Sequence, residues 1–119
     1  MKKPVIAIPI GDPAGVGPEI VAKSIASDEV FQIAVCVIVG DQKIVEKAIE
    51  ITGENLKINE IKEPEEAVDE KGVLNLINLD NVDMDTFAYG KVSAMCGKAA
   101  YEYIAKSIEL ANAGKVDAV

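Results

Sequence analysis

A stretch dense in glycine and proline follows the first apolar run and constrains the fold more than any other part of the chain. Residues 5–8 are apolar and predict a strand, and residues 20–26 predict a helix. Glycine permits close backbone approaches, and proline is tolerated in the first turn of a helix. We therefore expect a rigid loop between a strand and a helix N-terminus, a place where open α/β sheets bind small ligands. The loop contains Gly11, Pro13, Gly15, Gly17 and Pro18.

Two common glycine motifs do not match this loop. A P-loop has a second glycine five residues after its first, directly before the lysine. If the P-loop began at Gly11, Val16 would occupy the position of that second glycine. A dinucleotide fingerprint that began at Gly15 would have Ile20 in the place of its third glycine. As a plain strand-to-helix turn, the loop would use Gly17 as the helix N-cap. Glu19 would then lie at the positive end of the helix, which disfavours a bound anion there.

The middle of the chain predicts alternating strands and helices. Residues 31–39 are almost all apolar and rich in β-branched side chains, which predicts a strand buried on both faces. Asp41 follows as the expected N-cap of a helix, and Gly53 can end that helix in the left-handed conformation. Residues 56–61 and 73–79 predict two further strands, with an acidic, exposed segment between them. This rhythm predicts an α/β fold with a parallel sheet.

A long helix is expected from about Ser93 to Asn112, with one apolar stripe against the sheet. Ser93 could cap this helix or contact a phosphate, and we favour the cap. Residues 116–119 predict the opening of a new buried strand, where a terminal carboxylate would be costly. We therefore expect the chain to be the N-terminal part of a longer protein. The stripe consists of Cys96, Ala100, Ile104, Ile108 and Ala111.

Charge and composition limit the classes of function. The net charge of −8 repels nucleic-acid phosphates and anionic membrane surfaces, so neither is expected as a partner. No apolar run is long enough to cross a membrane and no secretory leader is visible, so we expect a cytoplasmic protein. Cys36 and Cys96 are far apart and are expected to be packing residues. The absence of histidine excludes Ser-His-Asp catalysis and histidine-based metal sites from these 119 residues.

Two blocks of sequence resemble a known enzyme family. Residues 11–20, Gly-Asp-Pro-Ala-Gly-Val-Gly-Pro-Glu-Ile, resemble the N-terminal signature of the 4-hydroxythreonine-4-phosphate dehydrogenase family. This family belongs to the isocitrate/isopropylmalate dehydrogenase-like superfamily, whose other branches carry a related Gly-Asp-Gly-Ile-Gly-Pro-Glu loop. A second block agrees, and the resemblance extends over residues 1–119. The second block comprises residues 89–93, 97–100, 103–104 and 114–119.

The resemblance implies a three-layer αβα sandwich, with residues 1–119 as a single α/β segment at the N-terminus of a longer two-domain protein. The implied activity is the NAD- and divalent-metal-dependent oxidation and decarboxylation of a phosphorylated hydroxy acid such as 4-hydroxythreonine 4-phosphate, on the route to pyridoxal phosphate. Relatives that resemble the chain equally well act on threonate or erythronate 4-phosphate. A homodimer is also implied, with the active site near the subunit boundary.

Four loop residues, Gly11, Asp12, Gly15 and Gly17, are expected to shape the wall of the substrate and cofactor cleft. Asp12 could orient a ligand hydroxyl or only cap the turn with its own backbone. In the family pattern, a Thr-x-Pro-x-x-Lys segment and three metal-binding histidines come later, so residues 1–119 are expected to hold no catalytic residue and no metal ligand and to be inactive alone. A second hypothesis is an inactive fragment or ligand-binding α/β module, if the protein is really 119 residues long.

Overall fold

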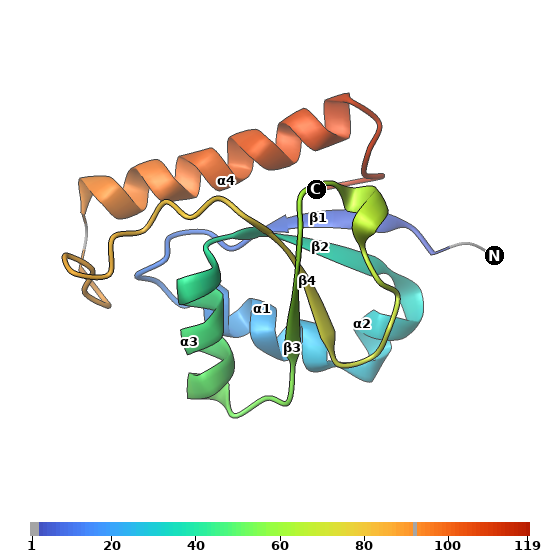
Figure 1. Cartoon of the computed structure of the whole chain (residues 1–119), viewed down its shortest axis with the longest axis horizontal. Coiled ribbons are helices and arrows are strands. Elements are labelled where there is room, and N and C mark those ends of the chain that lie inside the picture. Colours follow the sequence, from blue (N-terminus) through green and yellow to red (C-terminus); the bar gives the residue numbers. More distant parts are fainter. Residues whose placement is uncertain (1–2, 92) are drawn as a thin grey trace.

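A parallel sheet forms the centre of the molecule. The computed structural model describes residues 3–91 and 93–119, and the strands within them lie in the order β1-β2-β4-β3 (Figure 1). Every neighbouring pair is parallel, as the alternation of strands and helices predicts. The strands are β1 (Val5–Pro9), β2 (Val35–Gly40), β3 (Lys57–Ile61) and β4 (Val73–Asn78).

Helices cover both faces of this sheet. Helix α4 (Ala94–Asn112) packs along β1 and β2 on one face, and α1 (Gly17–Ala26), α2 (Asp28–Ile33) and α3 (Gln42–Thr52) lie on the other (Figure 1). A single 3₁₀ turn, η1 (Pro64–Glu66), lies in the acidic segment between β3 and β4. The arrangement is a three-layer αβα sandwich, which confirms the predicted fold class.

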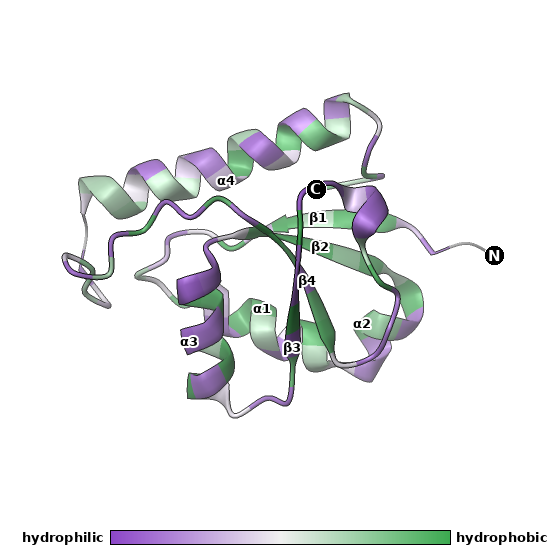
Figure 2. Ribbon diagram, viewed as in Figure 1, coloured by the Kyte–Doolittle hydropathy of each residue, from purple (hydrophilic) through white to green (hydrophobic). Residues whose placement is uncertain are grey.

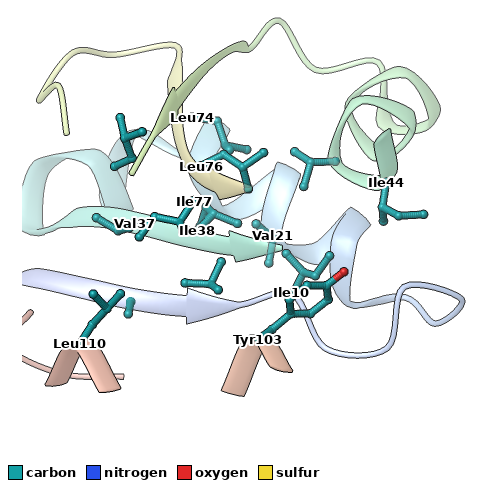
Figure 3. Close-up of a cluster of buried hydrophobic side chains, with 14 of the residues drawn as sticks. Ile10, Val21, Val37, Ile38, Ile44, Leu74, Leu76, Ile77, Tyr103 and Leu110 are labelled. Atoms are coloured by element: carbon teal, nitrogen blue, oxygen red, sulfur yellow. The ribbon is translucent and has the colours of Figure 1, made fainter. Parts of the chain in front are cut away.

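The core lies on both sides of β2 and β4, whose residues are mostly buried. Figure 3 shows Ile38 and Leu76 of these strands with Val21 of α1 and Ile44 of α3, while Tyr103 approaches from α4. Burying one such side chain contributes about 1.5–3 kcal/mol, so packing on both faces holds the layers together. Figure 2 shows that β1, β2 and much of β4 are hydrophobic, whereas α3 alternates between hydrophobic and hydrophilic residues.

The strand predicted over residues 31–39 is correct only in its second half. Residues 31–33 form the last turn of α2, and β2 begins at Val35. The start of β2 follows from its pairing with β1. Val5 is the first residue of β1, and its partner in β2 is Val35. Phe31 instead lies beneath the ammonium group of Lys3, which is 4.0 Å from its ring centroid, in a cation–π contact.

The buried face of α4 is rotated from the predicted stripe. Ile104 and Ile108 are 47% and 49% exposed, whereas Tyr103 is fully buried. The Tyr103 hydroxyl donates a hydrogen bond to Oδ1 of Asn81 at 2.7 Å, so this large ring is buried without leaving its hydroxyl unpaired. Spacing alone does not reveal that partner. The buried residues of α4 are Cys96, Ala99, Tyr103, Ser107 and Leu110.

Three predicted helix ends are confirmed. Oδ1 of Asp41 accepts a hydrogen bond from the backbone N–H of Lys43 at the start of α3. Gly53 ends α3 with a φ of 70°, in the left-handed region that favours glycine. The Ser93 hydroxyl accepts from the N–H of Cys96 at 3.1 Å, so Ser93 caps α4.

The sequence predicts the opening of a buried strand over residues 116–119, and the structure shows only part of it. The segment after α4 forms an isolated bridge with β1 at Ala118, and Val116 is buried while residues 117–119 are exposed. The N–H of Ala7 donates to the carbonyl of Ala118 at 2.9 Å, and the N–H of Asp117 donates to the carbonyl of Val5 at 2.7 Å. This pairing is parallel, so the added residues extend the same kind of sheet. Over residues 3–91 and 93–119, the helices lack the combination of length and apolar character needed to cross a bilayer.

Candidate functional site at the carboxyl edge of the sheet

The loop after β1 lies at the carboxyl edge of the sheet, together with the loops that follow β2 and β4. The chain leaves β2 toward α3 on one face and leaves β4 toward α4 on the opposite face (Figure 1). Because β2 and β4 are neighbours, the direction of the connections reverses between them. Open α/β sheets bind ligands at such a switch point, outside the carboxyl ends of the strands.

The geometry of the glycine–proline loop explains its composition. Gly11 has a φ of 77°, a conformation that side chains disfavour. Oδ1 of Asp12 accepts from the N–H of Ala14 at 2.8 Å, and the Asp12 carbonyl accepts from the N–H of Gly15 at 2.9 Å. A Cβ atom on Gly17 would lie 2.2 Å from the carbonyl oxygen of Ile10, so only glycine fits there. Asp12 therefore caps the turn, which is one of its two predicted roles.

The first turn of α1 differs slightly from the prediction. Val16 is the N-cap residue, without a side-chain hydrogen bond, and Gly17 is the first helical residue. Pro18 lies in the first turn, as predicted. Glu19 also lies there, and its Oε2 atom is buried without a hydrogen-bond partner. The helix terminus thus carries its own carboxylate, which disfavours a phosphate at this point.

A second segment packs against this loop. The N–H of Gly90 donates to the carbonyl of Ala14 at 3.0 Å. Nearby, the rings of Phe87 and Tyr89 meet edge to face with centroids 4.7 Å apart. Burial raises the pKa of Tyr89, and the negative charge of Glu19 raises it further. The first block of the family resemblance and the start of the second block therefore meet here, although Val92 in the second block lies outside the described residues.

Hydrogen bonds join the segments that follow β2 and β4. Oδ2 of Asp41 accepts from the N–H of Val82 at 2.9 Å, and Oδ1 of Asn78 accepts from the N–H of Gln42 at 2.9 Å. The Lys43 ammonium is 2.5 Å from Oδ1 of Asp80, and this hydrogen bond raises the pKa of Lys43. Side chains thus fill the switch point itself. Sequence reasoning assigned Asp41 only a capping role and did not identify the other residues.

The four predicted site residues, Gly11, Asp12, Gly15 and Gly17, lie together in one loop. None of them lines the five surface cavities that we measured in residues 3–91 and 93–119. One of those cavities is lined by Ile25 and other residues near the amino ends of the strands. The role of the loop as a cleft wall therefore stays a prediction. In the same part of the chain, no three Asp, Glu, Cys or His side chains converge as metal ligands would.

These features define a parallel α/β domain with a candidate ligand loop after its first strand. A family model described as "Pyridoxal phosphate biosynthetic protein PdxA" matches residues 32–119. The chain belongs to this family, which confirms the predicted resemblance.

Curated relatives and a solved structure agree with this assignment. A protein of Fusobacterium nucleatum named "Putative D-threonate 4-phosphate dehydrogenase" is 57% identical over 96% of the chain, and one of Clostridium botulinum with the same name is 48% identical over 98%. The crystal structure of a 4-hydroxythreonine-4-phosphate dehydrogenase from Burkholderia phymatum is 40% identical, with a TM-score of 0.92 over 98% of the chain. The chain covers only 34%, 35% and 35% of these three proteins, or about a third of their length.

Proposed function

We propose that residues 1–119 form the N-terminal part of a dehydrogenase that oxidises a phosphorylated hydroxy acid. The observation that carries this proposal is the 57% identity to a relative named as a D-threonate 4-phosphate dehydrogenase, over almost the whole chain. The position of the glycine–proline loop supports it, because the loop lies where parallel α/β sheets bind small ligands.

The proposed reaction removes a hydride from the carbon of a secondary alcohol and a proton from its hydroxyl group. NAD, when bound, accepts the hydride. The product is a keto acid, whose carboxylate leaves as carbon dioxide. The electron pair left behind takes up a proton. We expect the acid and the base for these steps to come from the part of the full-length protein that the chain does not cover, and we assign the described residues a role in shaping the cleft.

The described residues fit a cleft wall better than a metal or phosphate site. A divalent cation would need ligands from the part of the full-length protein that the chain does not cover, since no ligand cluster lies in residues 3–91 and 93–119. The dinucleotide phosphates would bind away from the first turn of α1, because Glu19 already occupies it. Exposed Val16 and Ile20 beside the loop offer apolar surface instead. We propose a homodimer, as the resemblance implies.

Two substrates within the family remain as candidates. D-threonate 4-phosphate is favoured because the relatives with 57%, 48% and 44% identity all carry that name. 4-Hydroxythreonine 4-phosphate is the second candidate, because the solved structure with a TM-score of 0.92 carries that name. These substrates differ by a hydroxyl or an amino group next to the carboxylate. A site that hydrogen-bonds one of these groups can reject the other strongly.

An assay of the full-length protein tests this proposal. We expect the protein to reduce NAD in the presence of a divalent cation and D-threonate 4-phosphate, with carbon dioxide as a product. With 4-hydroxythreonine 4-phosphate, we expect a kcat/KM at least about tenfold lower, a difference of about 1.4 kcal/mol. A matched reaction with a chelator controls for the cation. Absence of NAD reduction with both substrates, in a folded protein supplied with cation, would refute the proposed function.

A further inference from the structure

Asp41 makes more contacts than a helix cap requires. Its side chain is completely buried. One oxygen, Oδ1, accepts from the N–H of Lys43 and caps α3. The other, Oδ2, accepts from the buried N–H of Val82, which lies 41 residues further along the chain. An N-cap needs only the first of these bonds, so the second serves the segment that follows β4.

The segment after β4 is fixed at several places along its length, and in its middle the N–H of Asp83 and the hydroxyl of Thr86 donate to Sδ of Met95 in α4 at 3.2 and 3.7 Å. At its start, Asp41 binds the N–H of Val82, and the Tyr103 hydroxyl binds the side chain of the adjacent Asn81. At its end, the N–H of Gly90 donates to the carbonyl of Ala14 in the glycine–proline loop. The intervening residues thus connect a buried carboxylate at the switch point with the candidate ligand loop.

We propose that Asp41 is a positioning residue: it holds the segment from Val82 to Gly90 so that Gly90 keeps the loop at Gly11–Gly17 in its binding shape. A hydrogen bond to a carboxylate is stronger than one between neutral groups, and a buried N–H without a partner is costly. The position of Val82 therefore depends on this side chain. The inference rests on the proposed function, because it takes the loop to border the site.

Asn75 of β4 provides a matched control. It is also buried, and it also fixes a crossing segment through its backbone, since it accepts from the N–H of Val68 at 2.9 Å and donates to the carbonyl of Val68 at 3.0 Å. That segment follows β3, which lies on the far side of the sheet from β1. Replacing Asn75 should therefore destabilise the protein without disturbing the loop after β1.

The test compares Asp41→Asn, Tyr103→Phe and Asn75→Ala in the full-length protein. Asp41→Asn keeps the shape of the side chain but leaves only one acceptor oxygen, so it cannot accept from both the N–H of Lys43 and the N–H of Val82. Hydrogen–deuterium exchange of peptides covering residues 84–91 should become about ten- to a hundredfold faster in Asp41→Asn, and by a smaller factor in Tyr103→Phe. Asn75→Ala should speed exchange around Val68 and leave residues 84–91 unchanged.

Steady-state kinetics distinguish a positioning role from a purely structural one, because a residue that only stabilised the fold would leave KM and kcat unchanged. We expect Asp41→Asn to raise KM for NAD or for the substrate about tenfold, with kcat changed less than about twofold, and Asn75→Ala to change neither. Unchanged exchange at residues 84–91 in Asp41→Asn, equal effects in Asn75→Ala, or faster exchange with an unchanged KM would overturn the proposal.

Two outcomes separate this proposal from the proposed function. If Asp41→Asn does not fold, Tyr103→Phe must show the faster exchange and the raised KM, or the proposal is wrong. If the unmodified protein has no dehydrogenase activity, the proposed function fails, while unchanged exchange at residues 84–91 in a folded Asp41→Asn protein would separately refute the role of Asp41.

Discussion

At the scale of single residues, Gly17 is the position with the least room for a side chain. An added Cβ would lie 2.2 Å from the carbonyl oxygen of Ile10, which is backbone and cannot rotate away. We expect Gly17→Ala to lower the free energy of unfolding by about 1–3 kcal/mol, as overpacked sites do. Urea unfolding of the full-length protein measures this change.

Gly97 of α4 is the natural control for Gly17. It lies in a helix interior, it is exposed, and a Cβ would meet nothing within 4 Å. Gly97→Ala should therefore raise the free energy of unfolding by about 0.5–1 kcal/mol through helix propensity. If Gly17→Ala raised the free energy of unfolding as Gly97→Ala does, the steric account of the loop would be wrong.

At the scale of elements, an ion pair joins the segment that follows α4 to the residue that precedes η1. The Lys115 ammonium is 2.6 Å from Oε2 of Glu63; the hydrogen bond lowers the pKa of Glu63 and raises the pKa of Lys115. The stabilisation is therefore present above the ordinary pKa of a glutamate and is lost as pH falls through the lowered pKa of Glu63. It is present below the ordinary pKa of a lysine and is lost as pH rises through the raised pKa of Lys115.

A pH series of urea midpoints tests this contact. Lys115→Met should unfold at lower urea than the unmodified protein near neutral pH, by a small margin because both groups are exposed. This margin should shrink on acidification and on strong alkalinisation. Lys98→Met, on the exposed surface of α4, should show no such pH dependence. A margin that stays constant from acid to alkaline pH would mean that the ion pair does not stabilise the fold.

The elements also show how far the sequence alone could predict the fold. Local patterns were sufficient for the parallel strands and for the caps at Asp41 and Ser93, because these depend on neighbours within a few residues. The boundary between α2 and β2 depends on the length of β1, and the rotation of α4 depends on a partner for the Tyr103 hydroxyl. Both are contacts between distant segments, which periodicity does not record.

The same distinction applies to the candidate site. The spacing of glycine and proline predicted the loop at residues 11–18, because the backbone conformations that these residues favour depend only on nearby positions in the chain. The bond from Asp41 to Val82 and the bond from Gly90 to Ala14 join positions 41 and 76 residues apart, so they could not be predicted. A polar residue at the carboxyl end of each of two buried parallel strands, as with Asp41 after β2 and Asn78 at the end of β4, is the signal that could have indicated a filled switch point.

At the scale of the whole molecule, the fold brings the first block of family-like sequence and the start of the second to one edge of the sheet. The loop at residues 11–17 and the segment at residues 84–91 meet there. In our proposal, Asp41 holds the segment at residues 84–91 in place. Val16, Ile20 and Tyr89 nearby are large apolar residues that remain exposed. The central claim is that a small ligand binds against this edge rather than at the amino ends of the strands.

Hydrogen–deuterium exchange of the full-length protein, with and without NAD, divalent cation and D-threonate 4-phosphate, tests that claim most directly. We predict slower exchange in peptides covering residues 11–17 and 84–91 when the ligands are bound, and no change in peptides covering residues 28–36 at the opposite end of the strands. Ligand-dependent protection confined to other regions, in a protein that turns over the substrate, would contradict the account.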